Sequence, residues 1–173
     1  YSADPARLAQ DVDHRLARAA PPVDGRDRGG RHLRAIVVPH AGYTYSGDVA
    51  ARAYAVVRMQ RPARVAVAGP AHFVWLRGVA VPGDRGWTTP LGDVPLAEDL
   101  RTIAVEAGAH VDDRVHEREH AVEVQVPFLQ RVGAPDLAIL PVAVGETEPG
   151  EVARLLARLA AVADLIVVST DLS

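Results

Sequence analysis

Short, almost wholly apolar runs separated by helical patterns constrain the fold of this 173-residue chain more than any other feature. Strands that are buried on both faces have this composition, and such strands belong to parallel sheets covered by helices. The pattern therefore predicts a three-layer α/β domain with a mostly parallel central sheet. We expect four runs to be buried neighbours in that sheet: 33–38, 63–68, 137–144 and 165–168.

Apolar residues at helical spacing fill most of the remaining segments. The second helix is expected to begin at Ser46, acting as its N-cap, and to bury Val49. A shorter strand is expected at 78–81 and a turn at 90–94, whereas 121–126 fits both a strand and one face of a helix. The predicted helices are 5–20, 46–57, 96–107 and 149–159.

Composition places the chain among ordinary globular proteins and removes several kinds of chemistry. Hydrophobic residues make up 49% and charged residues 24%, and the net charge of −3 argues against a nucleic-acid or anionic-membrane binder. There is no cysteine, and every one of the 19 basic residues is arginine, so the sequence offers no thiolate and no Schiff-base lysine. The apolar runs are too short to cross a bilayer, and we expect a cytoplasmic location.

The run HEREH at 116–120 fits the zinc-peptidase signature H-E-x-x-H and also its reversed form H-x-x-E-H. A peptidase needs His116 and His120 to converge on one ion, with Glu117 beside them. No histidine follows His120, and the sequence after it lacks the metzincin continuation, although a downstream glutamate would serve as a third ligand. A zinc peptidase is therefore a remote alternative to a charged turn that leads into a helix.

Metal-competent side chains follow three of the predicted strands: His40, His72 and Asp171. Because ligands bind at the carboxyl ends of the strands in open parallel sheets, we expect these side chains to share one cavity. The residues alone support a metal or acid/base role and ordinary hydrogen bonding about equally. Tyr43 and Tyr45 lie beside His40, where they would either line a substrate pocket or pack against the turn.

Several segments resemble the Memo family, whose bacterial members are called AmmeMemoRadiSam system protein B. The resemblance covers 1–173 and implies a fold similar to that of class III extradiol dioxygenases, which are non-haem iron enzymes. It implies a pocket for iron (Fe²⁺) or copper, with His40 and His72 as metal ligands. It also matches Asp171 to a pocket aspartate, which we expect to be an outer hydrogen-bond partner of the metal or a substrate contact. His120 and Asp171 are the candidate catalytic groups, although a histidine at a helix start that bonds to a neighbouring loop explains His120 equally well. The segments that carry it occur in this order: VPHAGYTYSG, GPAHF, WTTPLGDV, EHAVEVQVPFLQ, LPVAVG and VVSTDLS.

Three departures from the family pattern bear on this pocket. The second histidine of the family's GPxHH is Phe73 here. The sequence stops at Ser173, before the family's acid/base histidine and before its further metal ligand, usually cysteine. We interpret the chain as a single Memo-like domain, 1–173, truncated at the C-terminus and slightly at the N-terminus. With two imidazoles alone, we expect this segment to bind no ion tightly.

Two functional hypotheses follow from the resemblance. The first is a metal-dependent, dioxygenase-like oxidoreductase of unknown substrate. The second is a non-catalytic adaptor that binds a metal or a phosphopeptide, because fold alone does not confer activity. The implied partners are a small molecule or peptide, together with the radical SAM and Amme-domain proteins of the same system.

The resemblance also predicts where the other histidines lie. We expect His116 at the surface, and the remaining histidines outside the pocket: His14, His32 and His110.

Overall fold

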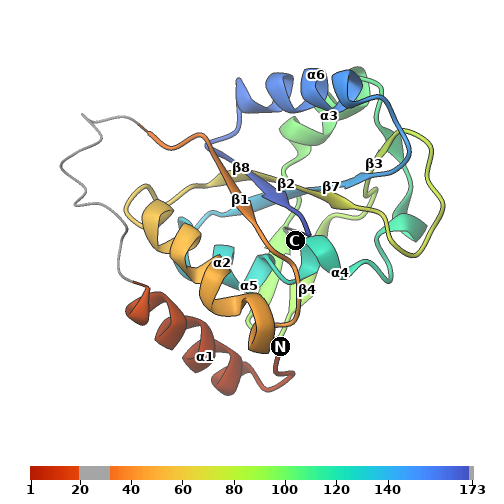
Figure 1. Ribbon diagram of the computed structural model, residues 1–173. Helices are drawn as coiled ribbons and strands as arrows, with labels where there is room; N and C mark the ends of the chain where they lie inside the picture. Colours follow the sequence, from red (N-terminus) through yellow and green to blue (C-terminus); the bar gives the residue numbers. More distant parts are fainter. Residues whose placement is uncertain (20–31, 172–173) are drawn as a thin grey trace.

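A six-stranded sheet lies between two layers of helices in the computed structural model, which describes residues 1–19 and 32–171 (Figure 1). The order of strands across the sheet is β1-β8-β2-β7-β3-β6, and β4 and β5 form a separate hairpin. The strands are β1 (Ala35–Val38), β2 (Arg64–Pro70), β3 (Val79–Val81), β4 (Gly86–Thr89), β5 (Gly92–Pro95), β6 (His110–Val111), β7 (Ala138–Val144) and β8 (Leu165–Ser169).

The four apolar runs predicted to be buried neighbours are the four adjacent strands β1, β8, β2 and β7, and all of them are parallel. The longest pairing joins β2 to β7 over the full length of both strands. The strand expected at 78–81 is β3, which runs antiparallel to β7, while β6 pairs parallel to β3. The predicted three-layer, mostly parallel α/β fold is confirmed.

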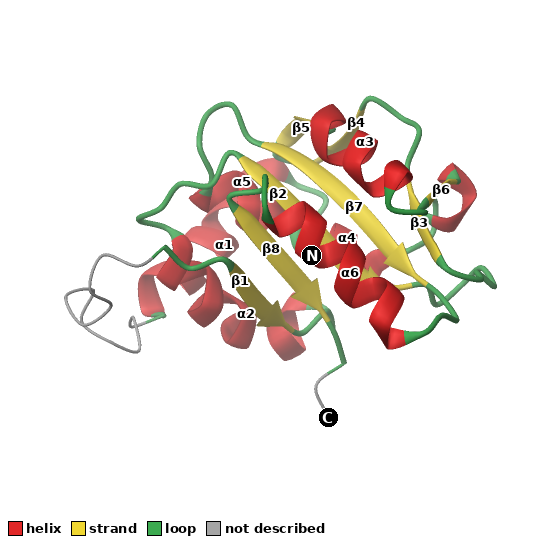
Figure 2. Cartoon of the chain, turned by 90° about the horizontal axis from the view of Figure 1, so that it is seen from above, coloured by secondary structure: helices red, strands yellow, loops and turns green. Residues whose placement is uncertain are grey.

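Helices cover both faces of this sheet (Figures 1 and 2). One layer holds α1, α2, α4 and α5, and the other holds α3 and α6. Their bounds are α1 (Pro5–Arg18), α2 (Tyr43–Val57), α3 (Glu98–Glu106), α4 (His120–Glu123), α5 (Val126–Val132) and α6 (Pro149–Ala160), with a 3₁₀ turn, η1, at Asp113–Val115.

Strand β2 shows why the apolar runs are continuous. Val65 and Val67 pack into the core beneath α1, α2 and α5, whereas Ala66 and Ala68 pack into the core beneath α3 and α6. Successive side chains of a strand point to opposite faces, so a sheet with two covered faces needs apolar residues at every position.

The predicted start of the second helix is wrong. Helix α2 begins at Tyr43 with Gly42 at its N-cap, and the Ser46 hydroxyl lies inside the helix, where it donates to the Ala41 carbonyl at 2.8 Å. Val49 is 57% exposed rather than buried. The next two residues are alanines that face the core, and the buried face of this helix combines such small side chains with Tyr43, Tyr54 and Val57.

The structure settles the segment that fitted both a strand and a helix, and it refines one predicted turn. The segment 121–126 is helical: α4 is followed at once by α5, which has proline at its first turn, a position where the missing N–H costs no hydrogen bond. In the segment predicted as a turn, 90–94, only residues 90–91 form the tip of the β4–β5 hairpin. Residues 92–94 belong to β5, its second strand.

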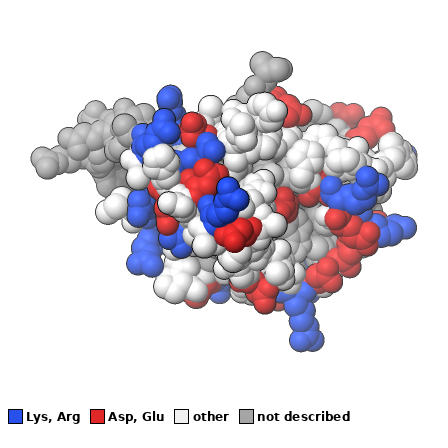
Figure 3. Space-filling model, turned by 90° about the horizontal axis from the view of Figure 1, so that it is seen from below, with Lys and Arg blue, Asp and Glu red and all other residues white. Residues whose placement is uncertain are grey.

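Acidic and basic side chains are interspersed on the face of the molecule shown in Figure 3. Some charged side chains pair between helices. The Arg131 guanidinium of α5 contacts Asp13 of α1 at 2.6 Å, and Arg15 of α1 contacts Asp48 of α2 at 2.7 Å. In the described part of the chain, no helix combines the length and the hydropathy needed to cross a membrane.

Candidate metal centre

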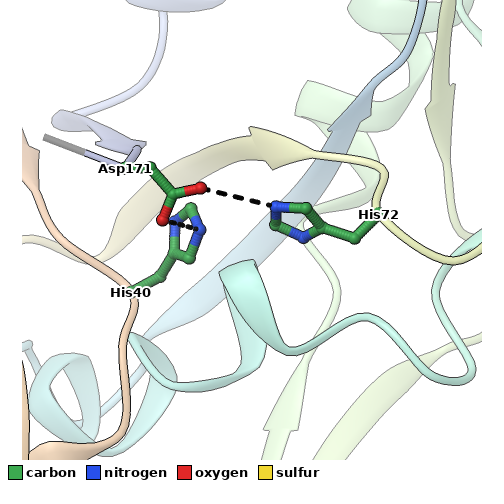
Figure 4. A group of neighbouring side chains, drawn as sticks. All are labelled: His40, His72 and Asp171. Carbon is green, nitrogen blue, oxygen red and sulfur yellow. Dashed lines mark ion pairs between the residues drawn. The ribbon is translucent and has the colours of Figure 1, made fainter. Parts of the chain in front are cut away.

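His40, Asp171 and His72 follow three consecutive strands of the sheet, β1, β8 and β2. These strands are parallel, so their carboxyl ends meet at one edge. The register aligns the first two residues closely, because Val38 pairs with Ser169 and each candidate residue lies two positions further along. The three side chains point toward one another at this edge (Figure 4).

The distances between these side chains suit a shared ion. The rings of His40 and His72 have centroids 5.2 Å apart. Asp171 lies between them, with one carboxylate oxygen 3.0 Å from His40 Nε2 and the other 3.7 Å from His72 Nε2. Two atoms bound to one ion at about 2.1 Å each lie up to about 4 Å apart. The expected juxtaposition of these residues is therefore present.

His40 is held by a buried network of neutral groups. The Ser169 hydroxyl donates to the Ala121 carbonyl at 2.6 Å and accepts from the Gln125 amide at 2.9 Å. Because the Ser169 hydroxyl proton is already donated to Ala121, the Ser169 oxygen accepts a hydrogen bond from His40 Nδ1 at 3.3 Å. With the proton on Nδ1, Nε2 carries a lone pair. Burial lowers the pKa of His40 against the opposing effect of Asp171, which favours this neutral ring.

The lone pair of His40 Nε2 receives no hydrogen bond from the described part of the chain. This nitrogen is buried and lacks a hydrogen-bond partner among the described residues, although an oxygen of Asp171 lies 3.0 Å away. Two lone pairs that face each other at this distance repel unless a cation or a proton lies between them. The group of donors therefore fits a metal ion.

His72 is held by a buried carboxylate. Its Nδ1 lies 3.0 Å from one oxygen of Glu119, and its backbone N–H donates to the other oxygen at 2.6 Å. Burial alone would raise the pKa of Glu119, but hydrogen bonds from His72 and from the Ala121 N–H outweigh it and lower that pKa. An ionised Glu119 accepts a hydrogen bond from the Nδ1–H group of His72. The other ring nitrogen, Nε2, therefore also presents a lone pair toward Asp171.

His120 lies beside this pair at the first position of α4. Its ring stacks on His72 with centroids 5.5 Å apart and lies 5.9 Å from the ring of His40. Gly69 of β2 makes this possible, because a Cβ at that position would lie 3.1 Å from the Ala121 Cβ, and its absence lets α4 approach the strand. The His120 side chain is 48% exposed, so it borders the candidate site on the solvent side.

A second cluster of potential ligands, His72, Glu119 and His120, overlaps the first. Both oxygens of Glu119 already accept hydrogen bonds, including two from backbone N–H groups. An ion bound by Glu119 would have to displace these donors, whereas the oxygens of Asp171 accept no hydrogen bond from the residues that the structure describes. The cluster of His40, His72 and Asp171 is thus the better candidate.

The HEREH segment does not form a zinc-peptidase helix. It runs from the end of η1 through a turn to the start of α4, and in the described residues His116 belongs to no cluster of potential metal ligands. The expectation that His116 lies at the surface is wrong, since it is 7% exposed and its ring lies 5.9 Å from that of Trp87. The other three histidines, His14, His32 and His110, are exposed and lie outside both clusters.

The two candidate pocket tyrosines occupy different environments. Tyr43 is buried, packs on Phe128 with ring centroids 5.1 Å apart, and donates its hydroxyl to the Val124 carbonyl at 2.8 Å. Burial raises its pKa. This placement matches the packing interpretation. Tyr45 is 86% exposed. Phe73, where the resemblance implied a second histidine, is half exposed with its ring 5.8 Å from that of His120.

Sequence reasoning missed Glu119, Ser169 and Gln125, which support the two imidazoles. The available signal was a polar residue inside an apolar segment: Gln125 alternates with valines, and Ser169 ends a strand of apolar residues. Both are buried in the structure, as is Glu119. Because buried polar side chains need hydrogen-bond partners, a polar residue inside an apolar segment indicates a residue that supports a site.

Fold and site together define a parallel α/β protein with potential metal ligands at the carboxyl edge of its sheet. The chain belongs to the Memo-like protein family, whose model matches residues 1–173. It is 36% identical over 165 residues to a MEMO1 family protein of Sulfolobus acidocaldarius, covering 91% of this chain and 58% of that protein.

Two further relatives give the same result. A MEMO1 family protein of Methanopyrus kandleri is 36% identical over 147 residues, covering 82% of this chain and 52% of the relative. A MEMO1 family protein of Thermotoga petrophila is 38% identical over 145 residues, covering 79% of this chain and 52% of the relative. The chain thus spans about half the length of the curated relatives it matches.

Proposed function

We propose that this protein binds one divalent metal ion through His40 Nε2, His72 Nε2 and the carboxylate of Asp171. The observation that carries the proposal is the pair of imidazoles whose Nδ1 atoms have acceptors and whose Nε2 atoms face one carboxylate. The sequence had suggested only two ligands in this chain. Asp171, expected as an outer partner or a substrate contact, is here proposed as the third.

The ligand set favours iron(II). Two histidines and one carboxylate, with the remaining positions open, are typical of non-haem iron oxygenases, and imidazole also suits copper. We therefore propose a metal-dependent oxidoreductase. When bound, the ion would supply Lewis acidity, one-electron chemistry and open coordination positions.

The residues of the chain would position and protonate the substrate around that ion. Ser169 and Glu119 fix the orientation of the two imidazoles through their Nδ1 atoms. His120 stacks on His72 with its edge open to solvent, so its ring nitrogens can hold or move a proton at a substrate bound beside Asp171. This assigns acid/base chemistry to His120 and binding to His40 and His72.

An anaerobic titration with Fe²⁺, followed by oxygen uptake with a panel of catechols, tests this function. The key variant is His40→Ala, and the matched control is His14→Ala, because His14 is exposed on α1. Stoichiometric binding and uptake that both depend on His40 support the oxidoreductase. Binding without uptake supports a non-catalytic metal-binding protein, and a wild-type protein that binds no metal overturns the proposal.

A further inference from the structure

We infer that Glu119 is a positioning residue that sets the proton on His72 Nδ1 and so keeps His72 Nε2 free to bind. The inference rests on the proposed metal centre. It begins from the isolation of this carboxylate, whose side chain is 1% exposed. Among the described residues, the only groups within ion-pair distance are the imidazoles of His72 at 3.0 Å and His120 at 3.7 Å.

A buried carboxylate without an arginine partner is costly, so its surroundings must supply hydrogen-bond donors. Every hydrogen-bond partner of Glu119 in the described part of the chain can do so. Two are backbone N–H groups, of His72 at 2.6 Å and Ala121 at 2.9 Å, and the third is His72 Nδ1 at 3.0 Å. The backbone donors fix the carboxylate in place. The carboxylate in turn fixes both the main chain and the ring of His72.

This arrangement selects one form of the neutral His72 ring. A carboxylate only accepts hydrogen bonds, so Nδ1 must carry the proton. The negative charge also makes the ring a stronger donor of its Nε2 lone pair, as with carboxylate–histidine pairs at metal sites. His40 has only a neutral hydroxyl in the equivalent place, so the two imidazoles differ in basicity.

Glutamine at position 119 cannot reproduce this pattern. Its amide group has nearly the same shape but carries N–H donors on one side. If the amide nitrogen faces the backbone N–H of His72, two donors oppose each other. If it faces Nδ1 instead, it opposes the Ala121 N–H and donates to Nδ1, and the ring proton moves to Nε2, which then cannot bind a metal.

The test compares Glu119→Gln with Glu117→Gln, a change at an exposed glutamate of the same segment. Long-range ¹H–¹⁵N NMR of the metal-free protein reports which nitrogen of His72 carries the proton. Zn²⁺ titration reports affinity, and circular dichroism reports folding. We expect a proton on Nδ1 in the wild type and in Glu117→Gln. In Glu119→Gln we expect a shift toward Nε2–H and an affinity roughly 10–100-fold lower.

Two outcomes would overturn the inference. One is a folded Glu119→Gln protein with wild-type His72 signals and wild-type affinity. The other is a wild-type protein whose neutral His72 carries its proton on Nε2, a result that needs no variant and stands even if Glu119→Gln does not fold. If the wild type binds no metal but its proton lies on Nδ1, the proposed function fails while the role of Glu119 in setting that proton is supported.

Discussion

His40 and His72 present the same ring nitrogen to the same carboxylate, but the protein holds them by different means. His40 is 2% exposed and its Nδ1 faces the neutral hydroxyl of Ser169. The His72 side chain is 32% exposed and its Nδ1 faces the buried carboxylate of Glu119. One imidazole is thus part of the core, and the other is carried by a loop that a single side chain anchors.

This difference separates stability from affinity. Groups around His40 also connect β1, β8 and the α4–α5 segment, so changes there should affect folding as well as binding. Among the described residues, the hydrogen bonds of His72 go to Glu119, next to the start of α4, so changes there should act mainly on the metal. A neutral acceptor should also influence its imidazole less than a charged one.

Removal of either imidazole should give the largest effect. We expect His40→Ala and His72→Ala each to lower affinity for Fe²⁺ by more than about 100-fold, since losing a ligand should exceed the 10–100-fold cost typical of losing an outer partner. Only His40→Ala should also lower the free energy of unfolding markedly, by roughly 1–3 kcal/mol, because it leaves a cavity in the core, whereas the His72 side chain is partly exposed. Calorimetric titration and urea unfolding measure the two quantities. Equal losses of stability would remove the distinction between the two sides.

Gln125, in the buried network around His40, should contribute to the stability of the fold. It accepts from the Tyr54 hydroxyl at 3.0 Å and donates to the Pro39 carbonyl at 3.0 Å and to Ser169 at 2.9 Å. Gln125→Leu keeps the volume but leaves these buried groups unpaired, so we expect a loss of about 2 kcal/mol in urea unfolding. The exposed residue Gln10 offers a control, as Gln10→Leu. Unchanged stability in Gln125→Leu would show that the network contributes little.

Ser169→Ala should weaken metal binding less than Glu119→Gln does. It removes a neutral acceptor from His40 Nδ1, and neutral hydrogen bonds are about half as strong as charge-assisted ones. We expect an affinity loss of no more than about tenfold, at the low end for outer partners. Parallel Zn²⁺ titrations of both variants measure the ratio. A larger loss in Ser169→Ala would reverse the proposed ranking of the two supports.

His116 provides a buried histidine without a metal-binding environment. Burial lowers its pKa, so the unfolded state binds a proton more readily than the folded state. Its contribution to stability is therefore complete above the unfolded pKa of about 6.5 and is lost as pH falls through the lower folded value. The slope from one group is at most about 1.4 kcal/mol per pH unit.

Replacing His116 by Leu should flatten this acid limb and leave metal affinity unchanged. Urea unfolding at several pH values between about 5 and 8, around the ordinary histidine pKa, measures the slope for both proteins. His14→Leu, at an exposed position, is the control. A lower metal affinity in folded His116→Leu would instead indicate that His116, and with it the HEREH segment, takes part in metal binding.

The regular part of the fold was predictable because it depends on local composition. Strands covered on both faces must be apolar throughout, and this signal located β1, β2, β7 and β8. The start of α2 was not predictable in the same way, because Ser46 has the chemistry of a cap but lies inside the helix, and its hydroxyl donates to the carbonyl of Ala41, which precedes the N-cap Gly42.

The placement of the candidate ligands was also predictable, since His40, His72 and Asp171 follow parallel strands whose ends meet. The burial of His116 was not, because the turn between η1 and α4 decides which of two nearby histidines faces the core. Neither was Glu119, whose role depends on a hydrogen bond to a residue 47 positions away.

Pulsed electron paramagnetic resonance of the Cu²⁺-loaded protein tests most directly whether both imidazoles bind one ion. The remote nitrogens of coordinated imidazoles modulate the echo, and two equivalent rings add combination lines that one ring does not produce. We predict a two-imidazole pattern in the wild type that becomes a one-imidazole pattern in His40→Ala and likewise in His72→Ala. A two-imidazole pattern that persists in both variants, or a wild type with a single coordinated imidazole, would contradict the shared centre.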